Sequence, residues 1–250
     1  MNFLILGERC KDIFVYGEVP RLSPEAPVPI FKPIRTVEND GMANNVYNNL
    51  FNLIEKKASL VGHFSGGNIT KTRYVDEKTN HYFIRVDEND KVNSLEITPT
   101  LRRLISNADC VIISDYDKGF ISLNDIYLIC QETKESSVIF LDTKKKLTPV
   151  IFDQVDFVKM NESEYELNHI IANQFPEKVI LTKGGNGAYY NGQDFSSTEK
   201  KLTVDVSGAG DTFLAALAFY YMQGKSMPFA IEKANELASK VVSERGVSVI

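Results

Sequence analysis

The feature that most constrains the fold is the alternation of short apolar segments with segments of helical periodicity in the second half of the chain. The segments predicted to be strands are residues 110–114, 138–142, 157–160 and 179–182. The segments predicted to be helices are residues 100–106, 123–132, 148–153, 162–173, 211–223 and 228–243. Apolar strands that alternate with helices form a parallel sheet with both faces covered. The sequence therefore predicts an α/β fold with a doubly wound, mostly parallel sheet.

The first half of the chain predicts a smaller β unit beside this sheet. Residues 2–7 have the character of a buried strand, and residues 42–55 have the apolar spacing of a helix. Residues 12–38 combine β-like runs with several prolines, which is typical of edge strands or of a flap. Residues 72–74 and 81–87 predict a hairpin. We expect a single domain over residues 1–250, with lid segments at about 12–38 and 72–87.

Polar residues stand at the carboxyl ends of the four predicted strands of the second half. They are Asp115, Asp142, Asn161 and Thr182. In open α/β sheets, ligands bind beyond the carboxyl ends of the strands. These residues therefore predict a ligand site at one edge of the sheet.

A glycine-rich turn precedes the helix predicted at residue 211. The turn runs from Asp205 to Gly210 and is followed by Asp211 in the first helical turn. Unpaired N–H groups at a helix start attract anions such as phosphate, so a carboxylate there needs a chemical task. That task is to accept a proton from a hydroxyl while the N–H groups hold a migrating phosphoryl group. This predicts a kinase of small hydroxyl compounds; the alternative is plain turn chemistry with Asp as a helix cap.

Charge and cysteine usage restrict the class of protein further. The net charge of −5 argues against nucleic acid or an anionic membrane as the main partner. The three cysteines form no C-x-x-C motif and the three histidines have no ligand spacing, so neither a zinc site nor a disulfide framework is indicated. No apolar run is long enough for a membrane span, and the first residues lack the basic start of a signal peptide. We expect a cytoplasmic protein.

Two motifs support a family assignment. The stretch 205–211 resembles the C-terminal signature of the ribokinase-like (PfkB) carbohydrate kinases. Residues 21–30 (RLSPEAPVPI) and 114–119 (SDYDKG) are similar to the kinase part of the D-glycero-β-D-manno-heptose 7-phosphate kinases, which phosphorylate the anomeric O1. The likeness covers nearly the whole chain. It implies a sugar kinase that uses ATP and Mg²⁺, and it leaves open whether a monovalent cation assists.

The resemblance also implies roles for residues around the acceptor sugar. Asp211 would be the catalytic base, and the amides of Gly208, Ala209 and Gly210 would form the anion hole. Residues implied to bind the substrate are Asp12, Gly41, Asn44, Asp115 and Lys118. An Asp-Lys-Gly sequence is equally typical of a plain turn, so the role of Lys118 stays open at this point.

A second group of residues is implied to bind the nucleotide. Asn161 and Glu164 match the motif that organises magnesium and phosphates, with metal contact expected to be indirect. They also fit a helix N-cap with its capping-box Glu. The remaining residues of this group are Thr182, Lys183, Gly184, Gly187 and Asn235, with Lys144 near the phosphates.

Three departures from the family pattern bear on the substrate. Asp40 stands where the family has a glycine, which places a carboxylate near the sugar pocket. Residues 62–72 are shorter than usual, which predicts a smaller sheet edge or a more open cleft. Glu8 replaces the usual Asp after the first strand. Two alternatives remain, a kinase of another sugar or a nucleoside and a sugar-binding protein that has lost catalysis.

The sequence also suggests partners. Exposed edges of a β lid seek partners, so a homodimer through the lid is expected. The chain shows no nucleotidyltransferase motif, so we expect a separate protein to activate the product to a nucleotide sugar.

Overall fold

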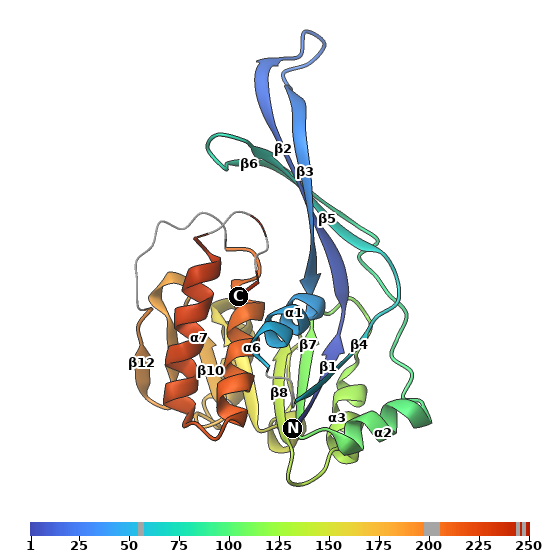
Figure 1. Cartoon of the computed structure of the whole chain (residues 1–250), viewed down its shortest axis with the longest axis vertical. Coiled ribbons are helices and arrows are strands. Elements are labelled where there is room, and N and C mark those ends of the chain that lie inside the picture. Colours follow the sequence, from blue (N-terminus) through green and yellow to red (C-terminus); the bar gives the residue numbers. More distant parts are fainter. Residues whose placement is uncertain (55–57, 198–205, 244–245, 247–248) are drawn as a thin grey trace.

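The main sheet forms the body of the molecule together with the helices packed on it (Figure 1). The computed structural model describes residues 1–54, 58–197, 206–243, 246 and 249–250. The sheet has eight strands in the order β12-β11-β10-β9-β8-β7-β1-β4. They are β1 (Asn2–Gly7), β4 (Ser59–Phe64), β7 (Cys110–Asp115), β8 (Val138–Thr143), β9 (Phe157–Asn161), β10 (Val179–Thr182), β11 (Ala188–Tyr190) and β12 (Gln193–Phe195). Neighbouring strands from β4 to β10 pair in parallel, and β11 and β12 add an antiparallel edge.

Helices cover both faces of this sheet. Successive strand residues point to opposite faces, so each face presents apolar side chains that the helices cover. In β1, Leu4 and Leu6 belong to one hydrophobic core, whereas Phe3 and Ile5 belong to the other. The first core includes side chains of α2 (Pro99–Asn107), α3 (Leu123–Glu132), α4 (Pro149–Gln154) and α5 (Glu162–Ala172). The second includes side chains of α1 (Ala43–Leu53), α6 (Ala209–Met222) and α7 (Met227–Val241). The predicted doubly wound fold is confirmed.

Local capping sets several helix starts at the predicted places. Ser122 with Asp125, and Asn161 with Glu164, form reciprocal capping boxes at the starts of α3 and α5. Proline in the first turn fixes the starts of α2, α4 and α7 without losing a helical hydrogen bond. Short-range sequence therefore determines where these helices begin. No helix within the described residues has the length and apolar character needed to cross a membrane.

A second sheet extends away from the helices as a lid (Figure 1). Its four strands lie in the order β3-β2-β5-β6. They are β2 (Arg9–Leu22), β3 (Pro29–Met42), β5 (Ile69–Asp76) and β6 (Tyr82–Glu88). β2 and β3 form one long antiparallel hairpin with register shifts near Gly17 and near Glu18. The lid strands thus extend a few residues beyond the predicted segments 12–38 and 72–87.

The lid joins the main sheet at two short connections. Glu8 alone separates β1 from β2, and residues 65–68 join β4 to β5. β4 is the edge strand of the main sheet, next to β1. The shortened 62–72 region therefore leads directly from the sheet edge into the lid.

Candidate active site

A cleft of about 620 Å³ lies at the carboxyl ends of β8, β9 and β10 and at the start of α6. Polar side chains and glycines from several elements line it, which is the pattern of a small-molecule site. The lining includes most of the predicted nucleotide residues and all the predicted catalytic ones. The predicted residues among them are Lys144, Asn161, Thr182, Gly184, Gly187, Gly208, Ala209, Gly210, Asp211 and Asn235.

Asp211 is held in the first turn of α6 by two donors from distant parts of the chain. Tyr116, just after β7, donates its hydroxyl to Oδ1 of Asp211. Asn45 in α1 donates from Nδ2 to Oδ2 at 3.1 Å. Asp211 is 5% exposed, and burial raises the pKa of its carboxyl from 3.8 to about 6, with the two hydrogen bonds opposing the rise. The carboxylate is thus buried and aimed at the cleft, yet mostly ionised at neutral pH.

The turn before Asp211 has the conformation that a helix start requires. Gly208 is the N-cap of α6 with φ of 82°, a left-handed conformation that glycine adopts without strain. The N–H of Ala209 donates to the carbonyl of Val206 at 3.3 Å, so it is partly engaged in the turn. The next two N–H groups, of Gly210 and Asp211, are at positions without an acceptor inside the helix. Asp205 lies outside the described residues.

A buried ion pair forms the floor of the cleft. Lys159 Nζ lies 2.8 Å from Asp142 Oδ2, and both side chains are less than a tenth exposed. Burial would lower the pKa of Lys159, but the carboxylates of Asp142 and Glu164 raise it above the ordinary value. A Cβ on Gly210 would lie 3.4 Å from Lys159 Nζ, so this cation is beside the start of α6. The site therefore contains a buried ammonium group beside the start of α6, with the Asp142 carboxylate as its partner.

Asn161 and Glu164 form the capping box that the sequence allowed. Asn161 N–H donates to Glu164 Oε2 at 2.7 Å, and Glu164 N–H donates to Asn161 Oδ1 at 2.9 Å. Glu164 also pairs with Lys144, which lines the cleft. Both oxygens of Glu164 accept hydrogen bonds, and the described residues contain no group of three acidic, His or Cys side chains suited to hold a metal. A direct protein cage for magnesium is therefore absent from the described part of the chain.

The loop after β10 borders the other end of the cleft. It continues into a short 3₁₀ turn (Gly184–Asn186), and Thr182 Oγ1 donates to the carbonyl of Met160 at 3.2 Å. Gly187 has φ of 87°, and a Cβ there would lie 2.1 Å from the carbonyl oxygen of Phe195. Asn235 in α7 donates to that same carbonyl at 2.9 Å. Lys183 is absent from the cleft lining and pairs with Asp194 at 2.6 Å.

Predicted sugar-binding residues at the root of the lid lie outside this cleft. Asp12 is 5% exposed and pairs with Arg73 of β5, and Cys10 donates to it at 3.6 Å. Gly41 leaves the space that Asp12 occupies, because a Cβ at 41 would lie 1.9 Å from Asp12 Oδ2. Asn44, at the start of α1, is half-buried.

Asp40 points away from this group. It follows Asn39 and precedes Gly41 in β3, and adjacent strand residues face opposite sides of a sheet. Its exposed carboxylate accepts a hydrogen bond from Asn48 at 3.2 Å. Asp40 therefore faces the side of β3 opposite to Asn39 and Gly41, and the expectation that it places a carboxylate near the sugar pocket stays a prediction.

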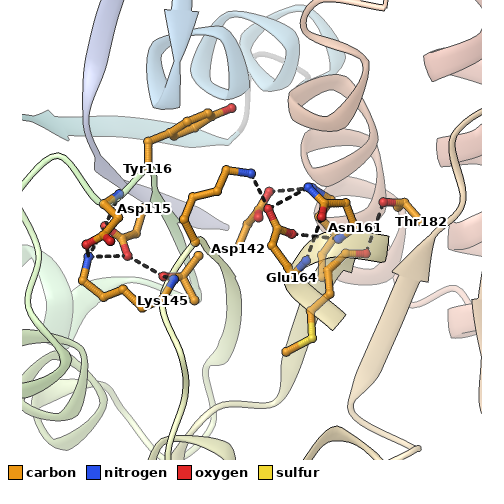
Figure 2. Close-up of polar contacts among 12 residues, drawn as sticks. Asp115, Tyr116, Asp142, Lys145, Asn161, Glu164 and Thr182 are labelled. Carbon is orange, nitrogen blue, oxygen red and sulfur yellow. Dashed lines mark hydrogen bonds and ion pairs between the residues drawn. The ribbon is translucent and has the colours of Figure 1, made fainter. Parts of the chain in front are cut away.

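Asp115 and Lys118 are engaged in contacts that organise the loop after β7. Asp115 accepts hydrogen bonds from Thr143 and from Lys145, at 2.8 Å in the latter case (Figure 2). Lys118 pairs with Asp90. Figure 2 shows the Asp115–Lys145 pair apart from the group of Asn161, Glu164 and Thr182.

Glu8 fixes the same loop from the end of β1. It is fully buried and accepts the N–H groups of Tyr116 at 2.8 Å, Lys118 at 3.0 Å and Phe120 at 3.3 Å. Burial raises the pKa of its carboxyl, and these hydrogen bonds oppose the rise. The longer Glu in place of the usual Asp thus has a defined structural role here.

Sequence reasoning missed four side chains that shape the site. They are Asn45, Arg73, Tyr116 and Lys159. Asp115 and Asn44 were predicted as site residues. The residue that follows each of them in the sequence, Tyr116 or Asn45, is the one whose side chain reaches Asp211. A lysine inside the predicted strand 157–160 was the available signal for Lys159, since a charge there needs a buried partner.

The structure combines a two-sheet architecture with a cleft at the carboxyl ends of the main-sheet strands. Residues 65–249 match the model of the pfkB family carbohydrate kinases, and the chain belongs to this family. The bifunctional protein HldE of Vibrio parahaemolyticus is 30% identical over 99% of this chain. The chain spans about three fifths of that relative, 61% of its length.

Solved structures agree on the fold. Ribokinase from Thermotoga maritima superposes with a TM-score of 0.72 at 17% identity, covering 98% of this chain and 94% of the ribokinase chain. Ribokinase from Arabidopsis thaliana, solved with ribose and ATP, gives a TM-score of 0.71 at 15% identity, covering 98% and 93%. At these identities the likeness shows the fold alone.

Proposed function

We propose that this chain transfers the γ-phosphoryl group of ATP to a sugar hydroxyl, with O1 of a heptose 7-phosphate as the acceptor. The observation that carries the proposal is the buried Asp211 carboxylate at the N-terminus of α6, facing the cleft. The motifs at residues 21–30 and 114–119, and the relationship to HldE over nearly the whole chain, support a heptose phosphate as the acceptor.

Asp211 has the properties of a general base for this reaction. With a pKa of about 6, it is ionised above that pH and accepts the proton of the acceptor hydroxyl as the oxygen attacks phosphorus. The new O–P bond forms while the bond to the ADP leaving group breaks. The N–H groups at the start of α6 and the Lys159 ammonium lie beside Asp211 and stabilise the charge on the transferred group.

The residues of the cleft fit ATP and a magnesium ion held mainly by phosphate. The cleft has the volume of a ligand site of this size, and its glycine loop allows close approach of a nucleotide. Magnesium keeps several waters and binds through substrate phosphates when few carboxylates are offered. Asn161 and Glu164 would then act through water molecules, and the ion would neutralise phosphate charge.

Replacing the base tests the proposal directly. We expect Asp211→Asn to lower kcat by at least about 10²-fold while ATP binding, measured by calorimetry, stays within about twofold. Asp125→Asn is the matched control, because Asp125 is also a first-turn carboxylate but lies in α3. Turnover of Asp211→Asn close to that of the control would exclude Asp211 as the base.

The pH profile gives a second test. Because Asp211 must be ionised to accept a proton, kcat/KM should fall as pH drops through about 6 and level off above it. A profile without an acid limb between pH 5 and 7 would contradict this role.

A panel of acceptors tests the substrate. Heptose 7-phosphate, free heptose, ribose, fructose 6-phosphate and adenosine are compared by ADP release. We expect the highest kcat/KM for the heptose phosphate. Preference for ribose or adenosine would favour a kinase of another sugar or a nucleoside. Sugar binding without turnover of any acceptor would favour a sugar-binding protein that has lost catalysis.

We also propose that two copies associate through their lids. Strand β6 is exposed along its length and presents the apolar side chains of Tyr82, Phe83, Ile84 and Val86 at an edge of the lid sheet. Exposed apolar edge strands seek partners. Analytical ultracentrifugation at micromolar protein should show a dimer, and a monomer throughout would remove this part of the proposal.

A further inference from the structure

We infer that Tyr116 is a positioning residue for phosphoryl transfer, because its hydroxyl fixes the orientation of the Asp211 carboxylate. The inference rests on the proposed role of Asp211 as the base. Tyr116 lies in the loop after β7, within the motif at residues 114–119. The composition of that motif alone does not indicate this role.

The two oxygens of Asp211 are held separately. Tyr116 donates to Oδ1, and Asn45 donates to Oδ2 at 3.1 Å. The donors come from positions 95 and 166 residues away in the chain, on different elements. A carboxylate held at both oxygens cannot rotate freely, so its remaining lone pairs keep one direction toward the cleft. Orientation of this kind is what a proton acceptor needs before the acceptor sugar binds.

Tyr116 is itself fixed in place. Its N–H donates to Glu8 Oε2 at 2.8 Å, which anchors the backbone. Lys71 Nζ lies 5.2 Å and Lys144 Nζ 5.5 Å from the centroid of its ring. These ammonium groups favour contact with the ring face and restrict its movement. These backbone and ring contacts therefore hold the Tyr116 hydroxyl in position to donate to Asp211.

The hydroxyl stays protonated, as a donor must. Burial, with the charges of Asp211 and Asp142, raises the pKa of Tyr116 well above its ordinary value. Its hydrogen bond favours the ionised form of Asp211 and opposes the effect of burial on that carboxyl. The other charged or titratable groups that face this pair are Asp142, Lys159, Lys71, Lys144 and Cys10.

Tyr116→Phe removes the hydroxyl and keeps the ring beside Lys71 and Lys144. We expect kcat to fall by about 10- to 100-fold, while the KM for ATP stays within about twofold. Loss of the donor should also raise the pKa of Asp211, so the acid limb of kcat/KM should move to higher pH. Tyr165→Phe is the matched control, because the hydroxyl of Tyr165 in α5 donates at 2.6 Å to Asn173 at the C-cap of that helix, and neither residue lines the cleft.

A graded substitution separates positioning from packing. Fluorotyrosine placed at position 116 alone keeps the shape of the ring but has a more acidic hydroxyl, which donates more strongly. We expect the acid limb to move to lower pH, opposite to the shift in Tyr116→Phe. A purely structural role would leave both profiles at the wild-type position, and that result would overturn the inference. The fluorotyrosine variant also decides the question if Tyr116→Phe does not fold.

The outcomes distinguish this inference from the proposed function. Asp211→Asn with wild-type turnover would contradict Asp211 as the base. Asp211→Asn without turnover, together with Tyr116→Phe within about twofold of wild type and an unshifted acid limb, would overturn only the role of Tyr116.

Discussion

The main sheet and the lid differ in where their ion pairs lie relative to the cleft. In the main sheet, Lys159 pairs with Asp142 and Lys144 pairs with Glu164, and Lys159, Asp142 and Lys144 all line the cleft. In the lid, charged residues pair within the lid itself, as Asp12 does with Arg73. Within the described residues, the cleft lining includes no residue of the lid strands.

This difference indicates that the two halves of the site are prepared to different extents. In the main sheet, the paired charges lie at the cleft where we propose that ATP binds. In the lid, the pair of Asp12 with Arg73 lies outside the cleft, and an acceptor sugar that binds Asp12 must compete with Arg73. We therefore expect changes at the main-sheet wall to affect ATP binding and changes at Asp12 to affect the acceptor, whereas breaking either buried pair should lower stability.

The largest effect is expected from breaking the buried pair in the main sheet. Lys159→Met leaves Asp142 buried without a counter-charge, which should lower the free energy of unfolding by about 3–5 kcal/mol. Chemical denaturation measures this change. Lys134→Met is the control, because its pair with Asp109 is 39% exposed on both sides and is worth at most about 1 kcal/mol. Equal losses of unfolding free energy in the two variants would mean that the buried pair contributes no more to stability than the exposed pair.

A smaller effect is expected at the glycine loop. Gly187→Ala forces a Cβ against the Phe195 carbonyl and should cost about 1–3 kcal/mol, with weaker ATP binding. Gly192→Ala is the control, since Gly192 also has a positive φ, of 84°, but a Cβ there meets nothing within 4 Å. Calorimetric titration with ATP compares the two. Unchanged ATP affinity in Gly187→Ala would mean that this loop does not contact the nucleotide.

The smallest effect on ligand binding is expected in the lid, where Asp12→Asn also leaves Arg73 buried without its counter-charge. Asp12→Asn should raise the KM for the acceptor by about tenfold and leave ATP affinity within about twofold. Glu38→Gln is the control on the same hairpin, where Glu38 pairs with Lys11 on an exposed surface. Weakened ATP binding in Asp12→Asn would break the distinction between the two halves.

The fold was largely predictable because its signals are local. The starts of α3 and α5 follow from Ser122 and Asn161 as caps, and the apolar strands end at the polar residues that the sequence indicates. The lid was predicted in kind, but its strands are longer than the predicted segments. Register shifts accompany the proline-rich part of the hairpin, between Tyr16 and Gly17 and between Glu18 and Arg21, and pairing there continues.

The site was less predictable because its contacts are long-range. Asn45 rather than Asn44 reaches Asp211, a choice set by the rotation of α1 against α6. Asp115 has the position of a ligand at a strand end, yet Lys145 and Thr143 occupy its oxygens. Strand-end position thus identifies the edge of the sheet, but the neighbours of each side chain decide what it can bind.

Glu8 connects β1 to the lid and contacts both supports of Asp211. Its side chain holds the loop that carries Tyr116, and its carbonyl accepts the N–H of Ala43, where the helix that carries Asn45 begins. The same residue is the only link between β1 and the first lid strand. A displacement of the first lid strand at this residue would therefore reach both supports of Asp211, so Glu8 links the position of the lid to the orientation of that carboxylate.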